Sequence, residues 1–403
     1  MRILFIVKEF PHSKVIGGPI IIYNRVKYLS RNHEVSLIAF ADNPTPGQEE
    51  SLAHFCKEMV LVPPPPSRSP ARRARDYLFG PVPPYFMFCH SPEMYERLRE
   101  MVARSRYDVI VSEYSMVAQF LYRNPDLDGI KRVMSVHECY YLARRKVLEV
   151  QGLSREGFVA LLHLKGLKGY EFDMYADADR LLTLTPEGRD ELLEVRSGLN
   201  ISVVPHGVDV TRFRPGERGD GPPTAMFLGN YPHDPNRDAV IYFGTKVWPE
   251  VKKRVPGARF LVVGRGPTDD MLTLASADPS IVITGQVDDV YPFLRESDAF
   301  VCPVRLGGGF RGKVLEAMAS GVPVVSTRLG AEGLPARDRE NILLADSPAE
   351  LADRTVLLLE DRALAGRIAT SARGLVVENY SWQRGVEILE GVLQEVVRES
   401  RGG

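Results

Sequence analysis

This sequence has few cysteines, no excess of charge of either sign and no long apolar runs. The 403 residues include four cysteines, Cys56, Cys89, Cys139 and Cys302, which lie far apart and form no C-x-x-C pair. We therefore expect neither a disulfide framework nor a cysteine metal site, and a reducing compartment fits. Lys and Arg number 51 against 52 Asp and Glu, a net charge of −1, so no global field favours nucleic acid.

Long apolar segments are missing as well. No run approaches the roughly 18 residues of a membrane-spanning helix, and no cleavable signal pattern precedes the first apolar run, Ile3–Val7. We therefore expect a cytoplasmic protein without a spanning helix. A chain of 403 residues exceeds what one hydrophobic core usually holds, which predicts two domains.

The most informative stretch of the sequence is Ala299–Thr327, AFVCPVRLGGGFRGKVLEAMASGVPVVST. It reads as a short buried strand, a glycine-rich loop, a helix with one apolar side and a second buried strand. Three glycines at 307–309 permit a sharp turn or a close approach of the backbone to a ligand. Gly321 followed by Pro323 predicts the end of the helix.

The polar residues of this stretch suit a phosphorylated ligand. A helix N-terminus offers unpaired N–H groups and the positive end of the helix dipole to an anion. Arg311 and Lys313 add two cations there. One turn later, Glu316 can accept hydrogen bonds from sugar or ribose hydroxyls. Three glycines alone would fit an ordinary strand-to-helix turn equally well. Together with two cations and a carboxylate they favour a ligand site.

The same stretch resembles the nucleotide-binding signature of GT-B glycosyltransferases of the GT4 type (glycosyl transferases group 1), near the form GGG-x-R-x-K-x-x-EAMA-x-G-x-PVV-x-T. The resemblance implies an α/β protein with two Rossmann-like domains facing across a cleft. Residues 1–205 would form the acceptor domain, and 206–380 the nucleotide-sugar donor domain. A final helix within 381–403 would pack back on the first domain. Most relatives carry two glutamates in the signature, whereas here Gly308 occupies the first position and only Glu316 remains.

The resemblance also implies which residues form the site. His137, at the end of a predicted strand, would hydrogen-bond the donor sugar, with Glu138 a weaker second candidate. Arg311 and Lys313 would face the diphosphate, so these two and His137 are the predicted catalytic residues. The predicted nucleotide-sugar-binding residues are Gly17, Gly18, Gly229, Arg237, Gly264, Val287, Gly308, Gly309, Phe310 and Glu316. No aspartate pair of the DxD type lies on a suitable loop, so neither a metal nor another cofactor is expected.

The activity implied is transfer of a sugar, with retention of configuration, from a UDP or GDP sugar to a hydroxyl acceptor in glycan, glycolipid or polysaccharide biosynthesis. Two alternatives remain: an isomerase resembling nucleotide-sugar 2-epimerases, and a non-catalytic subunit that binds nucleotide sugars. Incubation with donor alone distinguishes the first alternative, and turnover by the isolated chain the second. An NAD-dependent dehydrogenase is disfavoured because G-x-G-x-x-G is absent after the first strand.

Residues 63–84 break the α/β pattern with four consecutive prolines, then four arginines, and then prolines at 81, 83 and 84. One interpretation is a patch for anionic lipid or a lipid-linked acceptor, which would place the protein on the inner face of a membrane. The other is a solvated loop on the acceptor side, which the small number of basic residues favours. Farther on, residues 161–176 are predicted to form one helix.

Overall fold

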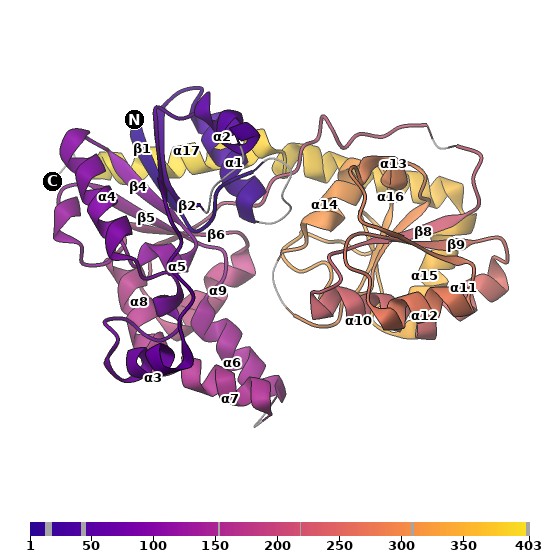
Figure 1. Cartoon of the computed structure of the whole chain (residues 1–403). Coiled ribbons are helices and arrows are strands. Elements are labelled where there is room, and N and C mark those ends of the chain that lie inside the picture. The colour runs from indigo at the N-terminus through magenta and orange to yellow at the C-terminus, as the bar shows by residue number, and fades with distance from the viewer. Residues whose placement is uncertain (13–17, 42–45, 152–153, 218, 308–309, 400–403) are drawn as a thin grey trace. The chain divides into compact units, whose positions relative to one another are not determined.

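The computed structural model describes residues 1–12, 18–41, 46–151, 154–217, 219–307 and 310–399. The chain divides into two compact units. In Figure 1 the first is mainly indigo to magenta and the second mainly orange to yellow. Unit 1 comprises residues 1–205 together with 386–403, and unit 2 comprises 206–385. The last helix, α17 (Trp382–Glu399), therefore begins in unit 2 and continues into unit 1.

Unit 1 alternates strands and helices along the chain. Its elements are β1 (Arg2–Val7), α1 (Gly18–Leu29), β2 (Glu34–Phe40), α2 (Pro46–Ala53), β3 (Glu58–Val62), α3 (Pro70–Phe79), η1 (Phe86–Phe88), α4 (Pro92–Arg104), β4 (Val109–Glu113), α5 (Ser115–Ala118), η2 (Pro125–Leu127), β5 (Lys131–Val136), α6 (Tyr140–Gln151), α7 (Arg155–His163), α8 (Leu167–Asp177), β6 (Arg180–Thr183), α9 (Pro186–Val195) and β7 (Ile201–Val203).

The unit 1 sheet is parallel throughout, in the order β3-β2-β1-β4-β5-β6-β7. Both of its faces are covered, which is why its strands read as continuous apolar runs. Ile3 and Phe5 share one core cluster with residues of α1 and α17. Leu4 and Ile6 point the other way, into a cluster with residues of α4 and α8. Figure 1 shows α1, α2 and α17 gathered on the same side of this unit.

Unit 2 repeats the alternation with shorter strands. Its elements are β8 (Thr224–Leu228), α10 (Asp234–Tyr242), the π-helical turn η3 (Phe243–Val247), α11 (Trp248–Arg254), β9 (Arg259–Val263), α12 (Asp269–Ala277), β10 (Ile281–Gly285), α13 (Tyr291–Arg295), β11 (Ala299–Cys302), α14 (Gly312–Ala319), β12 (Val324–Ser326), β13 (Leu343–Leu344), α15 (Pro348–Glu360), α16 (Arg362–Asn379) and the start of α17.

The unit 2 sheet is also parallel, in the order β10-β9-β8-β11-β12-β13. Helix α14 buries Val314, Leu315 and Met318 against it, as the predicted apolar side requires. The helix ends where the sequence predicts, because Gly321 takes a φ of +74° and its N–H donates to the carbonyl of Met318. Two parallel sheets, each covered by helices, confirm the predicted α/β class.

Some local predictions are corrected by the structure. The single helix expected over 161–176 is wrong: Gly166, with a φ of +65°, separates α7 from α8. The second buried strand predicted within Ala299–Thr327 lies at Val324–Ser326. The proline-rich segment 63–84 contains the helix α3, whose first turn is capped by Ser69. Among the described residues, no helix is long and apolar enough to cross a membrane.

Each sheet has one topological switch point. In unit 1 the chain runs outward from β1 in one direction and from β4 in the other, and in unit 2 the same holds for β8 and β11. In open parallel sheets, ligands bind beyond the carboxyl ends of the strands at such a point. The loops after these four strands are therefore where side chains of each unit can meet a ligand.

Candidate functional site

In unit 2, the loops after β8 and β9 touch through two glycines. The N–H of Gly229 donates to the carbonyl of Val263 at 3.0 Å. Gly264 has a φ of +135°, and a Cβ there would lie 1.8 Å from the carbonyl oxygen of Gly229. Only glycine can occupy position 264 in this conformation. These two predicted site glycines therefore hold the ends of β8 and β9 close together, beside the switch point between β8 and β11.

Lys313 spans the same switch point from the other side. Its Nζ donates to Oδ1 of Asn236 at 2.6 Å and lies 4.3 Å from the ring centre of Phe227. Asn236 is fixed in turn, because its amide donates to the carbonyl of Asn230. Burial lowers the pKa of Lys313 to about 8, and the nearby Arg311 acts in the same direction. The lysine is therefore a poorly compensated cation.

Glu316 lies one turn farther along α14. Burial raises the pKa of its carboxyl group to about 7, against the opposing charges of Arg212 and Lys313. Among the described residues, none donates a hydrogen bond to this carboxylate. A partly buried carboxylate without donors inside the fold is suited to donors from a ligand, such as hydroxyl groups.

Arg311 occupies the N-cap position of α14. His233 holds the same position on α10. Burial lowers the pKa of His233, and the charges of Lys313 and Arg311 lower it further, so the three groups lie near one another. The sequence prediction did not include His233 or Asn236. The only signal for them was their place in NYPHDPNRDA, at the start of a helix after a strand.

Phe310, predicted to bind the nucleotide sugar, belongs to an aromatic stack. Its ring stacks on His206 with the centres 5.3 Å apart and on Tyr380 with the centres 6.0 Å apart. Gly312 keeps α14 close to this stack, since a Cβ there would lie 3.3 Å from the His206 ring. The stack positions the loop that precedes α14.

The other predicted residues of unit 2 do not all join this cluster. Arg237 is exposed and forms an ion pair with Asp270 at 2.8 Å, so its charge is already compensated. Val287 lies between β10 and α13, packed against the core. Gly308 and Gly309 lie outside the described residues, as does Gly17 of unit 1.

In unit 1, a buried ion pair lies at the switch point. Nη1 of Arg25 donates to both carboxylate oxygens of Glu113, at 2.7 and 2.9 Å, and to the hydroxyl of Ser135. Nε2 of His137 lies 2.7 Å from Oε2 of the same carboxylate. Burial by itself would raise the pKa of Glu113, but Arg25 and His137 outweigh it and lower it to about 2.

Tyr114 covers His137 from one side. The two ring centres are 4.3 Å apart and the planes are inclined by 31°. Tyr114 has a φ of +77°, which non-glycine residues rarely adopt. Gly18, a predicted site residue, makes room for this side chain, because a Cβ at position 18 would lie 1.2 Å from the Tyr114 hydroxyl oxygen. Sequence patterns gave no sign of Arg25, Glu113 or Tyr114.

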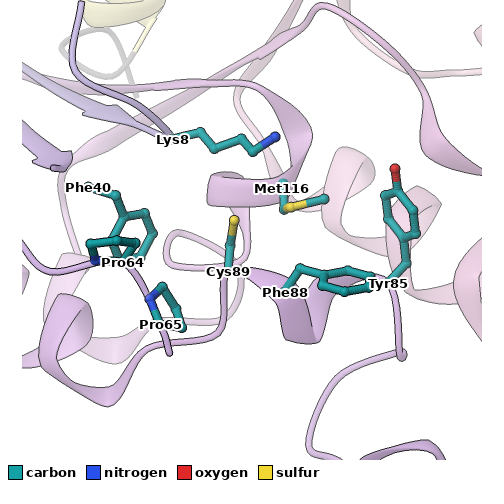
Figure 2. A pocket seen from close by; sticks show the side chains of 8 residues that line it. All are labelled: Lys8, Phe40, Pro64, Pro65, Tyr85, Phe88, Cys89 and Met116. Carbon is teal, nitrogen blue, oxygen red and sulfur yellow. The ribbon is translucent and has the colours of Figure 1, made fainter. Parts of the chain in front are cut away.

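Unit 1 also contains an open pocket with a volume of about 380 Å³. Figure 2 shows Phe40 and two prolines at one end and Tyr85 and Phe88 at the other, with the chain of Lys8 extending between them. The residues lining it are Lys8, Phe40, Pro64, Pro65, Tyr85, Phe88, Cys89 and Met116. Glu138 lies close enough to Lys8 for their charges to interact. Burial raises the pKa of Glu138, and the positive charges of Arg144 and Lys8 oppose that rise. The pocket is apolar with one cation.

Metal ligands are not gathered in the part of the chain that the structure describes. No group of three or more His, Cys, Asp or Glu side chains is arranged there to hold an ion. The site chemistry of the described residues is thus carried by two cations and a carboxylate in unit 2, and by a buried histidine–glutamate–arginine network in unit 1.

Comparison with known proteins gives a consistent assignment. Residues 16–212 match the model of Glycosyltransferase Family 4, and 222–361 match Glycosyl transferases group 1. A phosphatidyl-myo-inositol mannosyltransferase of Mycobacterium tuberculosis is 33% identical over 192 residues, which cover 44% of this chain and 50% of that protein. The chain thus matches about half the length of these curated relatives. A D-inositol 3-phosphate glycosyltransferase of Salinispora tropica is 27% identical over 337 residues, 76% of this chain and 67% of that protein.

Among solved structures, Anabaena Alr3699/HepE in complex with UDP superposes with a TM-score of 0.71 at 13% identity, covering 98% of this chain and 100% of that one. Fold and topology therefore define a GT-B protein, as the sequence predicts. The two family models match successive parts of the chain, a Glycosyltransferase Family 4 domain followed by a Glycosyl transferases group 1 domain.

Proposed function

We propose that this protein is a retaining, metal-independent glycosyltransferase that uses a nucleoside diphosphate sugar. The observation that supports this most is the placement of Lys313, Arg311 and Glu316 at the unit 2 switch point. Two cations and a helix N-terminus suit a diphosphate, and the carboxylate of Glu316 suits the ribose or sugar hydroxyls. Arg237 is assigned no role in this proposal, because it forms an ion pair with Asp270.

In the proposed reaction, the bond between the anomeric carbon and the diphosphate oxygen breaks. The acceptor oxygen forms a new bond to the same face of the anomeric carbon, and its proton passes to the departing diphosphate. Arg311 and Lys313 stabilise the charge that grows on the diphosphate as the bond breaks. No protein base and no metal are required for this step.

His137 is proposed to bind the donor sugar. Its Nε2 faces the ionised Glu113, so its Nδ1 is the nitrogen left for the sugar. Glu113 and Arg25 act as positioning residues because they fix the orientation of this ring. Tyr114, stacked on the same ring, restricts it further.

The nucleotide and the acceptor are proposed from relatives. Anabaena Alr3699/HepE binds UDP, so UDP sugars are the first donors to test, with GDP sugars next. The named relatives act on inositol compounds, one of them a phosphatidylinositol. We therefore propose a polyol acceptor in glycan or glycolipid biosynthesis, lipid-linked and reached from the cytoplasmic face of a membrane.

The test is a panel of UDP and GDP sugars scored by thermal stabilisation. A donor at 100 times its dissociation constant should add about 2.7 kcal/mol to the stability. The stabilising donor is then incubated with the protein alone and with an inositol acceptor. Product that forms only with acceptor supports the transferase, and isomerised donor without acceptor contradicts it. Lack of stabilisation by every nucleotide sugar of the panel would contradict the proposed class of donor.

A further inference from the structure

Exposed apolar side chains are concentrated in one part of unit 1. Among the described residues, eleven large apolar side chains are exposed, and seven of them lie on α3, η1 and α7. The seven, here called the α3–α7 surface, are Leu78, Phe79, Phe88, Phe158, Val159, Leu161 and Leu162. Phe79 is 81% exposed and Leu78 61%. The other four are scattered over unit 2 as Leu272, Val282, Leu306 and Val377, which is ordinary for a protein surface.

The three elements that carry this surface are in contact. Nζ of Lys165, just after α7, donates to the carbonyl of Tyr77 in α3 at 3.0 Å and lies 4.3 Å from the centre of its ring. His163, the last residue of α7, packs against Tyr85 and Phe88 with ring centres 5.4 and 6.0 Å apart. The elements that carry the α3–α7 surface are therefore linked through the end of α7 and the residue just after it.

The surroundings of this region are strongly basic. Residues 63–88 carry four arginines and a single acidic residue, and residues 155–168 carry one arginine, two lysines and one glutamate. Asp76, the acid of the first range, is paired with Arg68 at 2.6 Å. Arg72 and Arg73 are exposed on the first turns of α3. The whole chain has a net charge of −1, so this cationic surface is a local feature.

The positive charge of this surface favours one kind of partner over another. A second copy of this chain would bring two cationic regions together, which costs energy. A bilayer with anionic headgroups instead neutralises the arginines while its acyl region takes up leucine and phenylalanine side chains. The small number of basic residues in 63–84, which favoured a solvated loop on sequence grounds, is supplemented by Lys165, just after α7, and Lys168 of α8.

We propose that the α3–α7 surface docks the protein on anionic lipid bilayers. Tyr85 and Phe88 line the apolar pocket of Figure 2 and also contact α7, so the pocket opens beside the docking surface. Docking there brings a lipid-linked acceptor to the mouth of that pocket, with Lys8 placed for its phosphate. This assignment of the acceptor rests on the proposed function, whereas docking itself does not.

Vesicle sedimentation tests the proposal with the full-length chain. The protein should bind vesicles of mixed phosphatidylcholine and phosphatidylglycerol, bind pure phosphatidylcholine far less, and dissociate at high salt. Arg72→Glu with Arg73→Glu should weaken binding roughly thirtyfold or more, since each basic residue near an anionic surface contributes about fivefold. Leu78→Ser with Phe79→Ser should weaken it roughly tenfold or more through lost apolar burial.

Matched controls come from unit 2. Arg362→Glu with Arg367→Glu on α16 reverses the same number of exposed charges, and Leu272→Ser with Val377→Ser removes the same number of exposed apolar side chains. Neither control should change vesicle binding. Equal losses in test and control variants, equal binding to both vesicle types, or no binding by the wild type would each overturn the proposal. So would dimerisation that depends on Phe79 without vesicle binding.

Two further measurements keep the result interpretable. Melting curves show whether each variant is folded. Nucleotide binding, measured with UDP and GDP, should be the same for all variants because the cations for it lie in unit 2. Vesicle binding without nucleotide binding would leave the docking surface intact and contradict the proposed function instead.

Discussion

The switch points of the two units hold charged clusters with opposite electrostatic character. In unit 1, Glu113 is fully buried, accepts hydrogen bonds from Arg25, and has a pKa lowered to about 2. In unit 2, Glu316 is partly buried, has no hydrogen-bond donor among the described residues, and has a pKa raised to about 7. Both carboxylates lie at the same kind of sheet edge. One is held in its charged form by the protein, and the other is not.

The difference between the two carboxylates distinguishes a hydrogen-bond network that is complete within the protein from a site that a ligand can complete. Within the fold, Arg25 and His137 compensate the charge of Glu113, and this carboxylate in turn holds the His137 ring in place. Folding leaves Lys313 and Glu316 with shifts toward their neutral forms, which a bound ligand of complementary charge and hydrogen bonding would reverse. We therefore expect mutations in unit 1 to affect stability first and those in unit 2 to affect ligand binding and turnover first.

The largest expected effect is on stability in unit 1. Arg25→Met leaves Glu113 buried without its cation, and breaking a buried pair in this way typically costs about 3–5 kcal/mol. Lys313→Met removes a cation that burial already disfavours, so its effect on stability should be small. Urea denaturation of both variants checks this. Similar losses for the two would show that the clusters do not differ as their pKa shifts indicate.

The second effect concerns turnover in unit 2. Replacing Arg311 or Lys313 by Ala should cost roughly 2–4 kcal/mol of transition-state stabilisation, the range for removal of one preorganised donor. The loss should appear in kcat, because the charge on the diphosphate grows as the bond breaks. Steady-state kinetics of the single and double variants measure it. Turnover within about threefold of the wild type, with an unchanged melting curve, would place the diphosphate elsewhere.

The sequence predicted features that leave a local pattern, but not contacts between residues that are far apart in the chain. Strands such as β1 and the α14 segment were predictable because burial on both faces and helix-end glycines leave local patterns. Lys313 and Glu316 were predicted from their position at the start of a helix after a glycine-rich loop, and His137 through the resemblance. Arg25 and Glu113, by contrast, are 88 residues apart and meet only through the sheet order. Tyr114 depends on an unusual φ, which no residue pattern indicated. Arg237 was predicted through the resemblance, but its ion pair with Asp270, 33 residues away in α12, leaves no pattern in the sequence.

A third prediction compares two glycines of unit 2. Gly264→Ala adds a Cβ at 1.8 Å from a backbone carbonyl oxygen at a φ of +135°, and neither the strain nor the clash can be relieved by a side-chain movement. It should cost at least about 1–3 kcal/mol and abolish nucleotide binding. Gly312→Ala meets only the His206 ring at 3.3 Å, so a shift of a few tenths of an ångström suffices. Denaturation and nucleotide titration of the two variants test this, and equal behaviour would contradict the glycine contact.

A fourth prediction uses His137 to separate the two clusters by function. His137→Ala should lower kcat about tenfold or more through loss of a hydrogen bond to the sugar, while the dissociation constant for UDP or GDP stays nearly the same. Glu113→Gln should lower kcat by a smaller factor, since a neutral amide is a weaker hydrogen-bond partner for Nε2 of His137 and holds the ring less firmly. A parallel loss of nucleotide affinity in His137→Ala would argue that the residue supports the phosphate site or the fold.

The smallest effect expected is the pH dependence of nucleotide binding. The pKa of Glu316 is raised to about 7, so lowering the pH below 7 protonates its carboxyl group and removes an acceptor for ribose hydroxyls. The pKa of Lys313 is lowered to about 8, so raising the pH above 8 removes a cation from the diphosphate site. Affinity for UDP or GDP should therefore be highest between the two values. Between pH about 6 and 7.5 the ionised fraction of a group with a pKa near 7 rises about eightfold, which sets the upper limit of the change in affinity.

Isothermal titration across this pH range, repeated with Glu316→Gln, separates the effect of the Glu316 carboxyl group from the titration of the nucleotide itself. A profile in the Gln variant that matches the wild type on the acidic side would show that Glu316 does not contact the nucleotide, and the resemblance of unit 2 to a ligand site would then rest on its cations alone.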